Sequence, residues 1–110
     1  MAKYAVFFSY TPESWARMIA NPSDRMAAVK ASTESVGGSV ETMYFMFGER
    51  DGFVVVDLPD SEAAAAMSVA VSSTGAFRSV QTHELIAPAH LPQVLERART
   101  TAASYRPPGT

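Results

Sequence analysis

The chain of 110 residues has no cysteine and only two histidines. The lack of Cys excludes disulfides, thiolate catalysis, iron–sulfur clusters and Cys-based zinc sites. The two histidines, His83 and His90, are separated in the sequence, so we expect no protein-built site for zinc, iron or copper. The prediction is a protein without a metal or other cofactor.

Charge is also sparse, because charged residues make up 18% of the chain and the net charge is -2. Such a chain has little attraction for phosphate backbones or anionic membranes, so nucleic-acid and membrane partners are not expected. No stretch approaches the ~20 apolar residues of a membrane span. The first eight residues lack the apolar run and cleavage site of a signal peptide. We therefore expect a cytoplasmic protein.

Hydrophobic residues, at 47%, are abundant enough for a core, and the length is that of one ordinary domain. We predict a single domain over residues 1–103 and a loose tail over 104–110, where Pro107-Pro108-Gly109 lies. Aromatic and β-branched runs predict strands at residues 3–10, 39–47, 53–58 and 77–86. Helices are predicted after Thr11, after Asp24, after Asp60 and over residues 90–103. The order is that of a βαββαβ, ferredoxin-like α+β fold with an extra C-terminal helix.

Alternation along the predicted strands gives the sheet two faces, and both are partly apolar. A βαββαβ monomer has helices on one face only, so the other face would meet water. An exposed apolar patch of that kind usually marks an interface. We expect two chains to pair their sheets as a dimeric α+β barrel, in a homodimer or higher homo-oligomer. The residues predicted for this interface are Phe7, Phe53, Val55 and Phe77.

Four short stretches occur in an order and at separations typical of one family. They are Phe8-Ser9-Tyr10-Thr11-Pro12-Glu13, Asn21-Pro22-Ser23-Asp24-Arg25, Tyr44-Phe45-Met46-Phe47-Gly48-Glu49 and Asp57-Leu58-Pro59-Asp60. In these the chain resembles the GYD-domain family of small bacterial proteins, within the dimeric α+β barrel superfamily. The resemblance implies the fold and a homo-oligomer but no particular reaction. Arg50 stands where the family signature has Tyr.

Two groups of residues are candidates for a site. His83 and Asp57 share a predicted sheet face, where a His–carboxylate pair could serve as a general base or orient a substrate. A hydrogen-bonded pair in the dimer interface is the favoured alternative. Tyr10, Trp15 and Tyr44 could line an aromatic pocket for a flat organic ligand, with ordinary core packing as the alternative.

Two further patterns are given structural interpretations. Glu49, Arg50 and Asp51 are expected to form a solvated hairpin tip, with a salt-bridged dimer contact second. The element order and residues 50–54 resemble an RNA-binding RRM. The aromatic required later in that motif is absent, because Val55 and Val56 occupy those positions, and the chain is acidic, so we reject that interpretation.

The sequence thus predicts a homodimer that binds a small, flat, apolar organic molecule, with cofactor-free chemistry as an option. Whether the protein is an enzyme is left open. The alternative is a non-enzymatic stress-response or assembly protein whose pocket is closed. A cavity with unpaired polar groups beside Tyr10 and Trp15 favours the first, and a fully packed site favours the second.

Overall fold

The computed structural model describes all 110 residues and contains four strands and four α-helices. The strands are β1 (Ala2–Tyr10), β2 (Ser39–Phe45), β3 (Gly52–Leu58) and β4 (Phe77–Glu84). The helices are α1 (Pro12–Ala20), α2 (Arg25–Ser35), α3 (Ser61–Ser72) and α4 (Leu91–Ser104), with a 3₁₀ turn, η1, at Pro88–His90. The predicted β2 and β4 run two residues too far, to 47 and 86.

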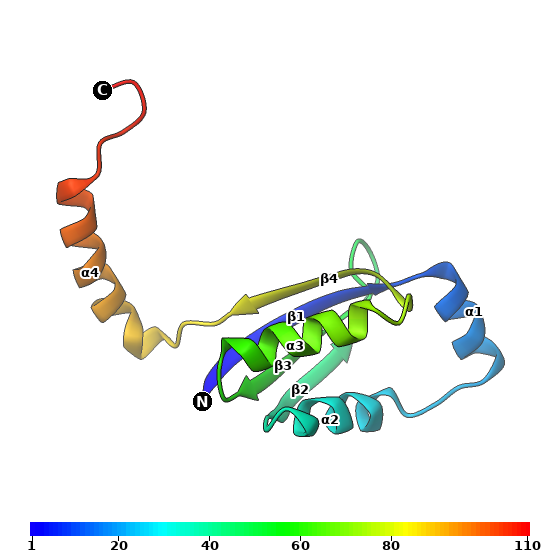
Figure 1. Ribbon diagram of the computed structural model, residues 1–110. Coiled ribbons are helices and arrows are strands. Elements are labelled where there is room, and N and C mark those ends of the chain that lie inside the picture. The colour runs from blue at the N-terminus through cyan, green and yellow to red at the C-terminus, as the bar shows by residue number, and fades with distance from the viewer.

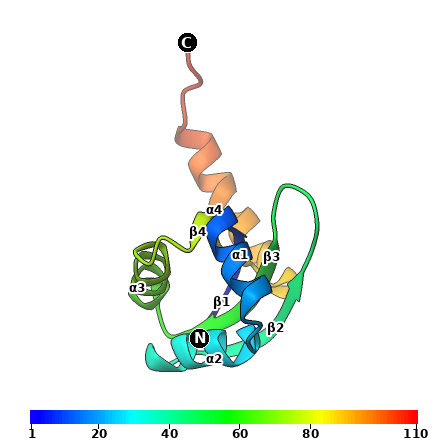
Figure 2. The same ribbon diagram turned by 90° about the vertical axis from the view of Figure 1, so that its right-hand side faces the viewer.

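The four strands form one antiparallel sheet in the order β2-β3-β1-β4. Helices α2 and α3 cover one face of this sheet, and α1 stands at the end of β1 (Figures 1 and 2). No helix lies over the opposite face, which we call the open face. This strand order and layering are those of the split βαβ sandwich, so the predicted α+β fold with an extra C-terminal helix is confirmed.

The core lies between the sheet and its two covering helices, and β3 forms its centre. Along β3, residues alternate between buried and half-buried positions, as a strand with a helix layer on one side requires. Leu58 is the largest side chain among those that are fully buried, at 1% exposure. The buried apolar cluster consists of Tyr4, Val54, Val56, Leu58, Ala63 and Ala64.

Each of the first three helices begins with a side-chain cap, as predicted. The side chains of Thr11, Asp24 and Asp60 accept the backbone N–H of the residue three positions later. Pro12 occupies the first turn of α1, where its missing N–H leaves no bond unmade. These local signals explain why the sequence places the helix starts correctly.

A β-bulge in β4 changes the face of Phe77. Tyr10 lies opposite Phe77 and Ser9 opposite Ser79, so Arg78 is an extra residue on β4. The bulge turns Phe77 to the helix side, where its ring stacks on Tyr10 with centroids 5.0 Å apart. The predicted place of Phe77 on the open face, and with it in the interface, is therefore wrong.

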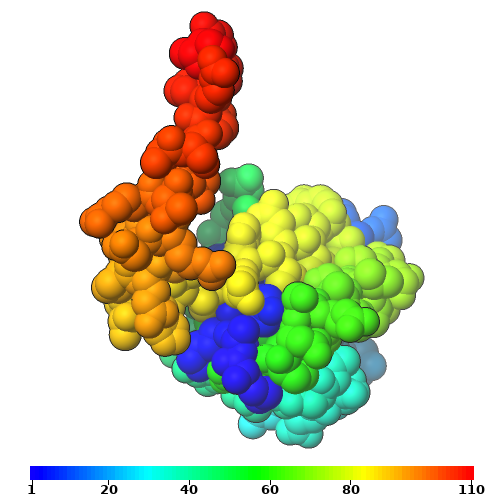
Figure 3. Space-filling model, turned by 60° about the vertical axis from the view of Figure 1, so that its left-hand side comes forward, coloured from blue at the N-terminus to red at the C-terminus, as the bar shows by residue number.

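Helix α4 stands apart from the sandwich. It leaves the end of β4 on the side away from α2 and α3 and projects from the rounded body of the molecule (Figures 1 and 3). All of its residues are exposed, including an apolar stripe of Leu91, Val94 and Leu95. No helix of this chain is both long enough and apolar enough to span a membrane.

Candidate functional site

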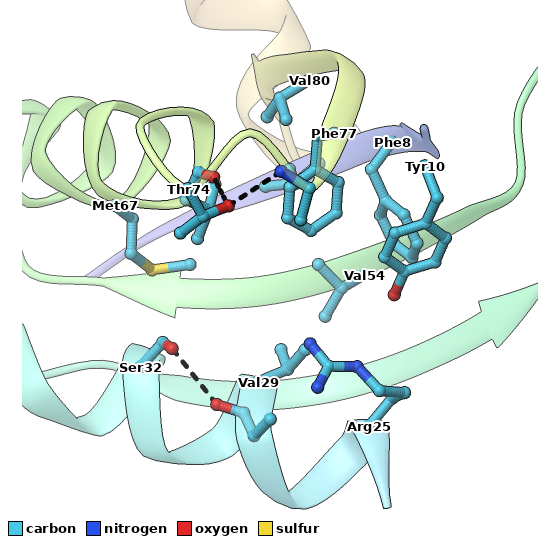
Figure 4. Close-up of a pocket in the computed structure, with 14 residues that line it drawn as sticks. Phe8, Tyr10, Arg25, Val29, Ser32, Val54, Met67, Thr74, Phe77 and Val80 are labelled. Atoms are coloured by element: carbon cyan, nitrogen blue, oxygen red, sulfur yellow. Dashed lines mark hydrogen bonds between the residues drawn. The ribbon is translucent and has the colours of Figure 1, made fainter. Parts of the chain in front are cut away.

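A cleft opens between α2 and α3, above the middle of the sheet (Figure 4). Its volume is about 300 Å³. Of its 14 lining residues, 11 are hydrophobic. The lining residues are Val6, Phe8, Tyr10, Arg25, Ala28, Val29, Ser32, Val54, Met67, Val71, Thr74, Ala76, Phe77 and Val80. Such a lining suits an apolar molecule held by a few polar contacts.

Four lining side chains carry polar groups, and two of these are already engaged. Ser32 Oγ donates to the carbonyl of Ala28, and Thr74 Oγ1 donates to the carbonyl of Val71. The hydroxyl of Tyr10 and the guanidinium of Arg25 make no hydrogen bond within the chain, and the Nε of Arg25 is buried. Tyr10 and Arg25 are therefore the polar groups free to meet a ligand.

The chemistry open to this cleft is limited by its lining. No His, Asp, Glu or Lys side chain faces it, so it offers no ordinary general base. Nowhere in the chain do three or more His, Asp or Glu side chains gather in a group that could hold a metal ion. What the lining offers is apolar surface and the polar groups of Tyr10 and Arg25.

Asp51 fixes the position of Tyr10. Its carboxylate accepts the backbone N–H of Tyr10 at 2.8 Å and the indole N–H of Trp15 at 3.2 Å. The Asp51 N–H donates to the carbonyl of Phe8 at 2.9 Å. The turn was predicted to be a solvated tip, and this is wrong for Asp51, which is half-buried and ties the turn to β1.

Of the three aromatic residues predicted for a pocket, only Tyr10 lines the cleft. Trp15 packs edge-on against Tyr10, with ring centroids 5.2 Å apart, and donates to Asp51, but it does not line the cleft. Tyr44 lies opposite Phe53 on the open face and is 62% exposed. The three rings therefore do not share this cleft, and the ligand-binding roles of Trp15 and Tyr44 stay predictions.

The open face carries a patch of aromatic side chains. Phe7 lies 5.8 Å from Phe53 and 5.9 Å from His83, measured between ring centroids. The guanidinium of Arg50 lies 5.4 Å from the centre of the Phe7 ring, a cation–π contact. Arg50 therefore covers part of this patch.

His83 and Asp57 share the open face, but the structure does not bring them together within one chain. His83 lies opposite Ala5, whereas the Asp57 carboxylate accepts hydrogen bonds from Lys3 at 2.9 and 3.2 Å. Lys3 also donates to Glu41 at 3.0 Å. The catalytic role of His83 and Asp57 stays a prediction, and the partner of Asp57 in this chain is Lys3.

Alkaline pH is expected to destabilise the protein through two groups. The hydrogen bonds to Asp57 and then Glu41 raise the pKa of Lys3 above its ordinary value of 10.5. Burial, followed by the nearby Glu84, raises the pKa of Tyr4 above its ordinary value of 10.0. Both groups hold their protons more tightly in the folded state. Their contribution to stability is therefore complete below about pH 10 and is lost as the pH rises through the folded pKa values.

Urea unfolding at roughly pH 8, 10 and 11 tests this, with an expected fall in the midpoint at the highest pH. In the Tyr4→Phe variant one of the two contributions is absent, so its midpoint should fall less steeply. A midpoint that holds or rises over this range would contradict the assignment.

Arg25 is the site residue that sequence reasoning missed. It follows the cap Asp24 as the first residue of α2, and the first turn of a helix gives no sign of where a long side chain will lie. Its side chain meets the cleft only because α2 packs against the sheet beside Val54 (Figure 4). The sequence shows only that Arg25 lies in one of the stretches typical of the family. It does not indicate where the side chain points.

Comparisons with known proteins bear on family and fold. The family model described as the GYD domain matches residues 4–95, in agreement with the resemblance drawn from short motifs. No curated protein matches the sequence. The solved structure of 30S ribosomal protein S6 from Thermotoga maritima is similar with a TM-score of 0.58 at 17% identity, over 89% of this chain and 97% of that one. A hypothetical protein from Pyrococcus horikoshii gives a TM-score of 0.49 at 13% identity, over 82% and 95%. At 17% identity the likeness to the ribosomal protein is one of fold.

Proposed function

This chain belongs to the GYD-domain family, and from that premise we propose that it is a homodimer in which each chain binds one small apolar organic molecule between α2 and α3. The observation that carries the proposal is the apolar cleft of about 300 Å³. Protein interiors are close-packed, so a hollow of this size is not an ordinary packing defect. Its volume falls at the lower end of the range for small-molecule sites.

Binding is favoured over catalysis because the lining supplies no ordinary general base. The alternative, a non-enzymatic stress-response or assembly protein with a closed pocket, fits less well. The cleft is open, and Tyr10 and Arg25 line it with polar groups that no other side chain engages. Unpaired polar groups are unfavourable in a pocket, and a pocket without a function gives no reason for them.

The dimer is supported by the open face. Helices cover only the other side of the sheet (Figure 2), so Phe7, Phe53 and Val55 are left half-buried where a monomer meets water. A second copy would cover them sheet to sheet and would also meet Tyr44. The exposed stripe of α4, which projects away from α2 and α3, offers the same copy a further contact.

The cleft is tested by filling it. Ala28 lines the cleft from α2, so Ala28→Phe places a ring in the space of the ligand. We expect this variant to bind naphthylmethanol or naphthoate at least about tenfold more weakly than the wild type, since overpacking a site costs free energy of that order. Isothermal titration calorimetry measures both affinities.

Ala31→Phe is the matched control, because Ala31 lies one turn further along α2, is exposed and does not line the cleft. This variant should bind as the wild type does. If neither naphthyl compound binds the wild type, or if Ala28→Phe binds both unchanged, the cleft is not the binding site and the proposal is wrong.

A further inference from the structure

Arg25 poses a specific problem of unpaired charge. Its Nε is buried and has no hydrogen-bond partner. A guanidinium N–H removed from water without an acceptor is unfavourable, and such groups in native proteins call for an explanation. Arg25 forms no ion pair in this chain, whose salt bridges involve Lys3 and Arg99. No group of this chain supplies the acceptor that the Nε of Arg25 lacks.

The nearest acidic residue in sequence does not supply this acceptor. The Asp24 carboxylate accepts the backbone N–H of Ala27 at 3.1 Å and thereby caps α2. The cleft itself contains no Asp or Glu. The only cation in the cleft therefore faces a lining without a counter-charge.

Tyr10 supplies a second donor on the same side of the cleft. Its hydroxyl points toward the side where Arg25 lies (Figure 4). The ring is held in place by stacking on Phe77 at 5.0 Å, and the Tyr10 backbone N–H is held by Asp51. A donor fixed in this way loses little freedom when it binds a ligand.

We propose that the ligand of the cleft is an amphipathic monoanion, an apolar body carrying one carboxylate, with the carboxylate bound by Arg25 and Tyr10. This inference rests on the proposed binding function. The Nε and one terminal nitrogen of a guanidinium match the two oxygens of a carboxylate. A single cation balances one negative charge, which favours a carboxylate over a phosphate dianion. The apolar body then lies along Val54 and Met67, toward the space between the two helices.

The test compares naphthoate with naphthylmethanol, which share the ring system and differ in charge. With the wild type, calorimetry should show naphthoate binding at least about tenfold more tightly, as expected for a hydrogen-bonded charge. Arg25→Met keeps an apolar stem of similar reach and should abolish this preference while leaving the affinity for the alcohol within about twofold. Tyr10→Phe should reduce the preference by about threefold or more.

Arg17→Met is the matched control, since Arg17 is an exposed arginine on α1 outside the cleft, and it should keep the full preference. Equal affinities of the wild type for acid and alcohol, or a preference that survives Arg25→Met, would overturn this inference and leave the binding function intact. Failure of both compounds to bind would instead overturn the binding function. Unfolding midpoints of each variant in urea establish that a loss of binding is not a loss of fold.

Discussion

Replacing Val55 with Glu is expected to convert the proposed dimer into a monomer or an aggregate. Val55 lies in the middle of the open face, opposite Ala5 on one side and Thr42 on the other. A standard stable interface buries ~1,600 Å² in total, and a carboxylate buried there without a partner costs roughly several kcal/mol. In the proposed twofold dimer the substitution would enter the interface twice, which doubles the cost.

Size-exclusion chromatography with light scattering measures this outcome at micromolar concentration. Val69→Glu is the control, since Val69 is 69% exposed on α3, away from the open face. It should leave the mass of the wild-type species unchanged. A wild type that elutes cleanly as a monomer, or a Val55→Glu variant that stays dimeric, would show that the open face is not the interface.

The Gly38→Ala variant is expected to lose about 3 kcal/mol of unfolding free energy, at the upper end of the usual cost of overpacking. A Cβ at position 38 would overlap the backbone carbonyl oxygen of Asp57 and lie 2.6 Å from Leu58 Cδ2. The carbonyl belongs to β3, where Asp57 lies opposite Ser39 of β2. It cannot move away without disturbing the sheet.

Gly75→Ala separates this steric cost from backbone strain. Gly75 has a φ of +75°, but a Cβ added there would have no other atom within 4 Å. Its substitution should cost only about 1–2 kcal/mol, the penalty of a left-handed conformation. Chemical denaturation at one fixed protein concentration gives both values, because the stability of a dimer depends on concentration. Equal losses in the two variants would remove the steric explanation for Gly38.

Features decided by neighbouring residues could be predicted from the sequence. Thr11, Asp24 and Asp60 cap their helices because a short polar side chain reaches the N–H three residues ahead in any context. The alternation of β3 likewise follows from strand geometry. Together these local rules were sufficient for the order of elements and the fold class.

Features that depend on distant contacts could not be predicted. The alternation rule assigns Phe77 to the open face, and one extra residue in the β4 ladder reverses that assignment. In the sequence Asp51 is an ordinary turn residue. Only the fold places Tyr10 of β1 and Trp15 of α1 within hydrogen-bonding distance of its carboxylate. Of the candidate ligand-binding residues, Tyr10 lines the cleft because it lies at the end of a strand under the helix layer, and Arg25 required the packing of α2.

Amide hydrogen exchange in the projecting helix α4 would report on the proposed assembly. A helix of 14 residues is only marginally stable in water when nothing packs against it. Alone, its backbone N–H groups would open and exchange quickly with deuterium, while those of the central strands exchange slowly. If the apolar stripe of Leu91, Val94 and Leu95 packs against a second copy, α4 gains protection as protein concentration rises. The exchange rate of this one helix then serves as an internal gauge of how much of the protein is assembled.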